Sequence, residues 1–301
     1  MLIILSFHYT KGFEMQIKKA GDALGGSVKG KILIYGQSGS GKSWLGVTAP
    51  SPLVLLTEKN GFASIAHSNP DAQVIECDKI EDIYAAIRAI KSGEISEFET
   101  LVIDSLTNAQ TMIKDRILSK STNKRMQRHD WGDLAEETLS LVQHLRFLDC
   151  HLVCLALRDD ELVSESGRRY TFPLFAGKKT KNNISQFFNA IGYLSREAGE
   201  TGISRTLLFD GDESILCKPC FPLPSHAPNP DLSQIINSMT GEELEDPFMK
   251  FIETHGGIEK VRAYAEHKGI KPPEDWDHVW KKRFISGIMQ GSINLDDLGD
   301  A

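Results

Sequence analysis

Short apolar runs recur along the chain and are separated by segments in which apolar residues keep helical spacing. Most of the runs are rich in Val, Ile and Leu and short enough to be buried strands. The predicted strands are 32–35, 53–57, 74–77, 100–105, 152–157, 187–194 and 204–209. Segments 80–90 and 108–118, and one that begins at Asp130, are predicted helices. Strands that alternate with helices predict an α/β fold with a mostly parallel central sheet.

The segment after the first run contains the most specific motif of the chain. Residues 36–43 match the pattern G-x-x-x-x-G-K-[ST] of a P-loop, between a predicted strand and a predicted short helix. Its backbone N–H groups would bind phosphate, Lys42 would bridge the β- and γ-phosphates of ATP, and Ser43 would ligate Mg²⁺. The predicted phosphate-binding residues are Gly36, Gln37, Ser38, Gly39, Ser40, Gly41, Lys42 and Ser43. The alternative is a Gly/Ser-rich turn that matches by chance.

Polar residues follow three later strands, at the edge where parallel α/β sheets bind ligands. Glu58 could act there as the general base toward the attacking water, and the alternative is a solvated loop carboxylate. Asp104 ends an apolar run in the Walker B pattern and would hold the Mg²⁺ ion from the side opposite Ser43. Arg158 ends the next run, where a γ-phosphate sensor could lie.

Charge is distributed unevenly along the chain. The net charge is −7, and residues 230–301, with 14 acidic and 8 basic residues, account for −6 of it. This balance argues against a wholly basic nucleic-acid coat and leaves a local basic groove open. Segments 119–129 and 159–171 are predicted polar loops with basic residues that could contact DNA phosphates, unless each is an ordinary solvated face. The candidates are Lys124, Arg125, Arg128, Arg168 and Arg169.

The five cysteines are predicted to be reduced thiols, because their number is odd and the N-terminus does not read as a signal peptide. Cys217 and Cys220 form a lone CxxC pair, and Cys150, Cys154 and His151 are the candidates to complete a zinc site. We favour the interpretation that Cys150 and Cys154 are buried cysteines of a strand, because they lie in an apolar run. No apolar run approaches the roughly 20 residues that span a bilayer, which favours a cytoplasmic protein that does not contact a membrane.

Five segments together resemble RecA-like ATPases. The closer resemblance is to the small phage ATP-binding proteins of the Sak-four type, reduced relatives of RecA and RadA used in recombination and single-strand annealing. The segments are KILIYGQSGSGKS, PLVLLTEKNG, TLVIDSLT, DWGDLAEETLSLVQHLR and HLVCLALRDD. Residues 15–222 would then form one RecA-like ATPase domain, after an N-terminal extension at 1–14. A Pro-rich linker at 223–230 and a helical, acidic C-terminal region at 231–301 would follow.

The resemblance also implies roles for the site residues. The P-loop residues would bind phosphates, Glu58 would be the catalytic base, and Asp104 would be the metal partner. Relatives place a polar sensor at the position of Arg158, usually not an arginine. RecA-like proteins act as oligomers, in which a basic residue of the neighbouring subunit can complete the site. Lys218 and Arg205 are the candidates for that residue.

We therefore expect an ATPase, dependent on Mg²⁺, that binds single-stranded DNA as a homo-oligomer in phage recombination, in the cytoplasm of a bacterial host. The alternative is an ATP-dependent loader or switch that acts through a protein partner of residues 231–301 and does not bind DNA itself. A small-molecule kinase is a third candidate, although the basic clusters lack the Arg-rich lid that such enzymes usually need.

Overall fold

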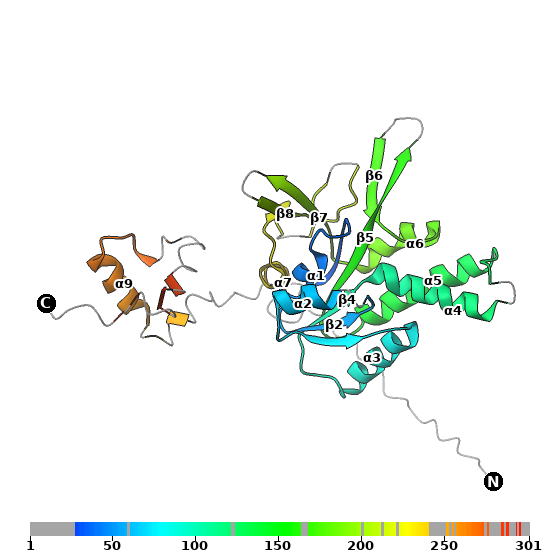
Figure 1. Ribbon diagram of the computed structural model, residues 1–301, viewed down its shortest axis with the longest axis horizontal. Helices are drawn as coiled ribbons and strands as arrows, with labels where there is room; N and C mark the ends of the chain where they lie inside the picture. The colour runs from blue at the N-terminus through cyan, green and yellow to red at the C-terminus, as the bar shows by residue number, and fades with distance from the viewer. Residues whose placement is uncertain are drawn as a thin grey trace, which may run out of the picture. The chain divides into compact units, whose positions relative to one another are not determined.

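The computed structural model describes residues 28–58, 61–121, 124–163, 168–199, 202–211, 214–220, 223–240 and parts of 251–295. The expected N-terminal extension at 1–14 lies outside these residues. Contacts divide the chain into two compact units, Met1–Glu242 and Glu243–Ala301, which are described separately. The first unit contains the sheet and its covering helices (Figure 1).

The first unit is built on a nine-stranded sheet in the order β3-β2-β4-β5-β1-β7-β8-β9, with β6 paired to β5. The strands from β3 to β7 are parallel, whereas β8 and β9 add antiparallel to β7, and β6 pairs antiparallel with β5. The strands are β1 Lys31–Gly36, β2 Pro52–Leu56, β3 Gln73–Glu76, β4 Thr100–Asp104, β5 His151–Val163, β6 Arg168–Pro173, β7 Ala190–Gly199, β8 Gly202–Leu208 and β9 His226–Pro228. The predicted α/β class with a mostly parallel sheet is confirmed.

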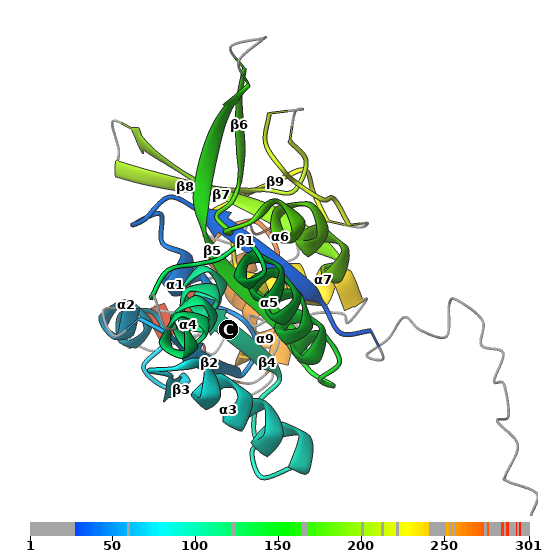
Figure 2. The same ribbon diagram turned by 90° about the vertical axis from the view of Figure 1, so that its right-hand side faces the viewer.

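Helices cover both faces of this sheet. Those of the first unit are α1 Lys42–Gly46, α2 Phe62–Ser68, α3 Ile80–Ser92, α4 Leu106–Lys120, α5 Asp130–Arg146, α6 Lys178–Asn183, the 3-10 helix η3 Ile184–Phe187, and α7 Leu232–Thr240. Helices α3, α4 and α5 pack on the face that carries Leu33, while α1, α2 and α7 pack on the face that carries Ile34. Figure 2 shows α4 and α5 in front of the strands. Burial on both faces explains why these strands are continuous apolar runs.

The segment predicted as a polar loop at 159–171 is instead a β-hairpin. Strands β5 and β6 pair from Arg158 with Pro173 to Val163 with Arg168, and the hairpin extends beyond the neighbouring strands (Figures 1 and 2). The prediction was wrong because it relied on apolar alternation, which a strand needs only where one face is buried. Here polar groups pair across the strands, as when the Thr171 hydroxyl donates to Asp160 Oδ1 at 2.9 Å.

The Pro-rich segment 223–230 contains β9, which pairs with β8, where we had expected a linker. Pro is tolerated there because β9 lies at the edge of the sheet. Helix α7 then packs into the core of the first unit through Leu232 and Ile236. Its first turn is also tied to Thr48, whose Oγ1 accepts from Leu232 N at 2.8 Å. The first unit therefore continues beyond the predicted boundary, to Glu242.

The second unit has a small apolar core of its own. Its described elements include α9, Gly257–His267, as the helical composition of this region predicts. Val261 and Ala265 of α9 pack in a cluster with Trp276 and Phe284, whose ring centroids lie 4.8 Å apart.

The described residues contain no group of three or more His, Cys, Asp or Glu side chains arranged to hold a metal. The zinc hypothesis therefore gains no support. Cys150 and Cys154 are buried in or beside β5, as favoured. Within the same residues, no helix is both long and apolar enough to cross a bilayer.

His151 is a buried polar residue at the start of β5, and it links stability to pH. Its Nδ1 accepts a hydrogen bond from Gly30 N at 3.0 Å, which requires the neutral ring. Burial lowers the pKa of His151 to about 4, and the positive charges of Lys29 and Lys31 act in the same direction. Because the unfolded chain binds this proton near pH 6.5, acid favours unfolding between about pH 6.5 and 4.

We expect His151→Asn to flatten the acid dependence of stability. Asparagine can accept from Gly30 N through Oδ1 and does not titrate. The free energy of urea unfolding of the wild-type protein should fall by roughly 2 kcal/mol more than that of the variant between about pH 7.5 and 5. Equal pH slopes for both proteins would contradict the assignment.

Candidate nucleotide-binding site

The P-loop connects β1 to α1 at the carboxyl edge of the sheet. In register, Gly36 pairs with Leu157 of β5 and Leu194 of β7, and a Cβ atom added there would lie 2.7 Å from the Leu194 carbonyl oxygen. Gly41 has φ of 98°, a left-handed conformation that favours glycine. The motif therefore has the strand, loop and helix context that phosphate binding requires.

Lys42 lies at the first position of α1, and its ammonium group folds back onto the loop. Its Nζ donates to the carbonyl oxygens of Gly36 at 3.0 Å and Gln37 at 2.9 Å. The side chain is buried, and burial lowers the pKa of Lys42, against the opposing effect of Asp104 and Glu58. The loop thus already holds the ammonium group of Lys42 against its own backbone.

Asp104 ends β4, with β5 between it and the P-loop strand. Burial raises the pKa of the Asp104 carboxyl, while a hydrogen bond with Ser43 and the charge of Lys42 lower it. Its Oδ2 atom is buried, and no described residue donates a hydrogen bond to it. A buried carboxylate oxygen without a donor, beside a serine hydroxyl, is a donor set that suits Mg²⁺. Ser43 and Asp104 are therefore the residues that could hold the metal.

Glu58 lies two residues beyond the end of β2 and reaches the same group. Its Oε1 accepts from the Ser105 hydroxyl at 3.3 Å, and Ser105 directly follows Asp104. The side chain remains exposed, so water can reach the carboxylate. The structure thus brings together Lys42, Ser43, Asp104 and Glu58, which the sequence placed on three separate segments.

Three residues that sequence reasoning missed hold the strand ends together. Thr57 Oγ1 donates to the Asp104 carbonyl oxygen at 3.0 Å and accepts from Ser105 N at 2.8 Å. Asn108 Nδ2 donates to the Thr57 carbonyl oxygen at 2.7 Å. Ser105 is also the N-cap of α4, since its hydroxyl accepts from Asn108 N. The available signal for this role was a serine three residues before the predicted helix at 108–118.

Arg158 is engaged away from the loop. Its Nη1 donates to the Tyr193 hydroxyl at 2.7 Å, and its Nη2 pairs with Asp160 at 2.9 Å. The hydrogen bond that Arg158 donates to Tyr193 is the main cause of a raised pKa for Arg158. By strand alternation Arg158 shares the face of Ala156, which packs with α4 and α5, whereas α1 lies on the other face. The structure therefore does not bring Arg158 to the loop.

The two other basic candidates differ in position. Arg205 of β8 donates from Nε to the Ser40 carbonyl oxygen at 2.9 Å, within its own subunit. Lys218 instead donates to the carbonyl oxygens of Ser185 and Phe188, near the start of β7 and at the end of the strand remote from the P-loop. Arg205 is thus part of the loop's surroundings, and Lys218 is not.

The predicted DNA-binding residues occupy two separate places. Lys124, Arg125 and Arg128 are exposed between α4 and α5, whereas Arg169 is exposed on β6. The side chain of Arg168 lies outside the described residues. In Figure 1 the ends of α4 and α5 and the β5–β6 hairpin extend in different directions.

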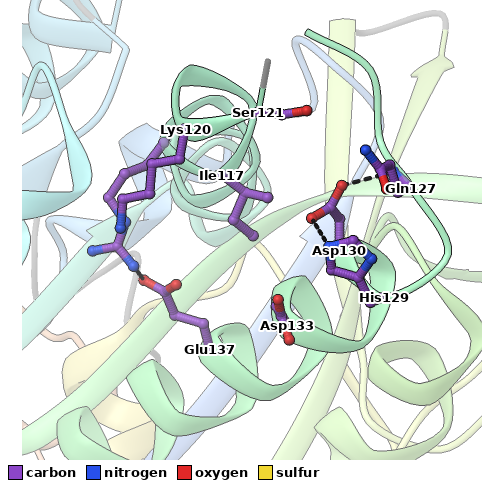
Figure 3. A pocket seen from close by; sticks show the side chains of 9 residues that line it. Ile117, Lys120, Ser121, Gln127, His129, Asp130, Asp133 and Glu137 are labelled. Atoms are coloured by element: carbon purple, nitrogen blue, oxygen red, sulfur yellow. Dashed lines mark hydrogen bonds and ion pairs between the residues drawn. The ribbon is translucent and has the colours of Figure 1, made fainter. Parts of the chain in front are cut away.

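A cavity of about 460 Å³ lies between the end of α4 and the start of α5 (Figure 3). Its charged side chains largely neutralise one another. Arg116 pairs with Glu137 and Glu81, and His129 lies 3.3 Å from Asp130. Asp130 also accepts from Gln127 N at 2.7 Å. We therefore interpret this cavity as a space between packed helices and not as a ligand-binding site.

A family model described as an AAA domain matches residues 29–219, well over half of the chain. The chain belongs to this family. The matched AAA domain includes every residue of the site described above, from the P-loop to Arg205. It is a nucleotide-binding P-loop domain of the ATPase type.

Solved structures that resemble the AAA domain protein include a KaiC-like protein from the archaeon Pyrococcus horikoshii OT3, with TM-score 0.33, 11% identity, and coverage of 60% of this chain and 77% of that chain. Another is an ATPase from the type III secretion system of pathogenic bacteria, with TM-score 0.39, 17% identity, and coverage of 58% of this chain and 54% of that chain. Likenesses this distant carry no argument about activity. No curated protein matches the chain.

Proposed function

We propose that this AAA domain protein is a Mg²⁺-dependent ATPase that binds single-stranded DNA as a homo-oligomer. The observation that carries the ATPase part is the convergence of Lys42, Ser43, Asp104 and Glu58 at one edge of the sheet, with a buried oxygen of Asp104 lacking a donor among the described residues. Phage recombination of the Sak-four type, in a bacterial cytoplasm, is the setting that the sequence resemblance favours.

The residues of the site divide the work of hydrolysis. The loop amides and Lys42 bind and orient the phosphates. Ser43 and Asp104 would hold Mg²⁺, which supplies charge neutralisation at the phosphate oxygens when bound. Glu58, exposed but fixed by the Ser105 hydroxyl, orients a water molecule and accepts its proton.

A second cavity, of about 410 Å³, supports the DNA part of the proposal. Trp131, 42% exposed on the first turn of α5, lines it together with Lys114 and Lys181. Lys181 also pairs with Asp159 at 3.2 Å, so one acidic side chain shares the cavity. An exposed tryptophan beside two lysines offers a stacking surface for a base and contacts for the backbone. The basic residues between α4 and α5 and on β6 would extend this surface.

The same cavity is joined to the nucleotide site through Thr107. This lining residue follows Ser105 by two positions, and its Oγ1 accepts from Leu157 N at 3.0 Å and donates to the Leu174 carbonyl oxygen at 3.2 Å. A DNA strand bound against Trp131 would therefore contact α4, the helix that begins two residues after Asp104. This continuity is the basis for coupling DNA binding to hydrolysis.

Fluorescence anisotropy with a labelled oligonucleotide tests the DNA part. We expect Trp131→Ala to weaken binding roughly 5- to 140-fold, since stacking contributes on the order of 1–3 kcal/mol per base. Phe147→Ala is the matched control, because Phe147 is another exposed aromatic residue, at the opposite end of α5. Affinity should fall steeply with salt.

The absence of any binding at low salt with ATP present would favour the second candidate, a nucleotide-dependent loader or switch. The observation behind that candidate is the separate unit Glu243–Ala301, which has its own core and lies in the acidic part of the chain. Such a unit could bind a protein partner without DNA.

A further inference from the structure

Arg205 of β8 lies against the P-loop. Its Nε donates to the Ser40 carbonyl oxygen at 2.9 Å. A Cβ atom added to Gly41 would lie 2.5 Å from the same Nε, so the arginine covers the loop immediately before α1. The bond fixes one edge of the guanidinium, and among the described residues we find no partner for its two terminal nitrogens.

The residue opposite Arg205 is a second arginine. Arg196 of β7 pairs directly with Arg205 across the antiparallel ladder. Like charges in that relation destabilise a strand pair. The next pair along the ladder on the same face, Leu194 with Leu207, packs in the core with Leu45 of α1. The two arginines therefore continue that face toward the P-loop, where they raise the positive potential beside it.

The position along the sheet indicates which part of a nucleotide Arg205 can reach. Asp104 and Glu58 approach from the side of β4 and β2, whereas β7 and β8 lie on the other side of β1. The reacting phosphate must face the carboxylates. A cation from β8 consequently faces the phosphates that do not react.

We infer that Arg205 binds the non-reacting phosphates of the nucleotide in the same subunit whose loop it contacts. This inference rests on the proposed function and names a residue of its binding site. With Nε held by Ser40, the terminal nitrogens present the planar fork that phosphate oxygens accept in pairs. Lys42, which is a compact charge held by Gly36 and Gln37, supplies no such fork. Arg205 thus acts in cis, in contrast to the contribution from a neighbouring subunit that the sequence suggested.

Calorimetric titration with ADP tests the inference without depending on hydrolysis. We expect Arg205→Gln to weaken ADP binding about 10- to 100-fold, the effect of losing a charge-assisted hydrogen bond. Arg205→Lys should keep part of the affinity. Arg88→Gln, an exposed arginine of α3, is the control and should bind as wild type does. If wild type itself binds no ADP, the proposed function fails. If wild type binds ADP and Arg205→Gln binds it equally tightly, the inference about Arg205 fails and the proposed function stands.

Steady-state kinetics separate phosphate binding from support of the loop. Loss of a contact to a non-reacting phosphate raises KM and leaves kcat unchanged. Because glutamine can still donate to the Ser40 carbonyl oxygen, a residue that only holds the loop would be replaced by Gln without loss. A fall in kcat at unchanged KM would also overturn the inference.

Mixed oligomers distinguish action in cis from action in trans. Equal amounts of Lys42→Ala and Arg205→Gln protein are combined at an ATP concentration below the KM of wild type. Phosphate release no greater than the sum of the separate proteins is expected. Recovery beyond that sum would show that an intact Arg205 acts on a neighbouring subunit's loop, and would contradict the inference.

Discussion

Replacing Lys42 with alanine is expected to lower kcat/KM for ATP hydrolysis roughly 100- to 1,000-fold, the usual loss when a preorganised donor to the reacting group is removed. Lys42 is buried at the start of α1, directed at the loop, with Asp104 and Glu58 close enough to affect its pKa. No other cation among the described residues occupies that position. The change should therefore remove most of the charge stabilisation of the transferred phosphate.

Phosphate release at saturating Mg²⁺ measures this effect. Lys91→Ala, at an exposed position of α3, is the matched control and should keep wild-type activity. Because alanine leaves the carbonyl oxygens of Gly36 and Gln37 without the Lys42 donor, thermal unfolding of the variant should be followed in parallel. A folded Lys42→Ala protein that hydrolyses ATP normally would refute the assigned role.

Glu58→Gln should separate binding from chemistry. We expect kcat to fall roughly 100- to 10,000-fold, the range for removal of a general base, while ATP affinity changes little. The reason is position, since Glu58 accepts from the Ser105 hydroxyl next to Asp104 and makes no hydrogen bond with the described P-loop residues. Glutamine keeps the size of the side chain and removes its basicity.

Single-turnover hydrolysis and ATP titration of the same variant give the two quantities. Glu94→Gln, at an exposed position after α3, serves as the control. Unchanged single-turnover rates in Glu58→Gln would show that Glu58 is a solvated loop carboxylate, the alternative that the sequence left open.

The parts of the site that were predictable are those whose signal is local. The P-loop at 36–43 is contained in eight consecutive residues, and Asp104 and Glu58 are marked by the buried strands that precede them. Parallel strands bring such ends to one edge, so their meeting could be expected before the structure was known. Ser105 was read as the last residue of the predicted strand, so neither its role as the N-cap of α4 nor its bond to Glu58 was predicted.

The unpredicted features depend on pairings between distant segments. Arg205 and Ser40 are 165 residues apart, and the position of β8 beside β7 determines whether they meet. The β5–β6 hairpin was missed because its polar residues show no buried face. Strand β9 was missed because its Pro228 is tolerated only at a sheet edge, which the sequence does not reveal.

The charge pattern was a similarly incomplete guide to DNA. Runs of basic residues directed attention to Lys124, Arg125 and Arg128, which lie between α4 and α5. Trp131 and Lys181 come together only through the packing of α5 with α6 and the base of the hairpin. Such a cavity is a property of the tertiary structure and has no counterpart in a linear count of charges.

The most direct test of the central claim is phosphate release by the wild-type protein with ATP and Mg²⁺, in the absence and presence of single-stranded DNA at low salt. We expect hydrolysis that DNA accelerates and that Lys42→Ala removes. Hydrolysis that is indifferent to DNA would contradict the coupling and favour a switch that acts through a protein partner. The absence of hydrolysis under both conditions would contradict the account as a whole.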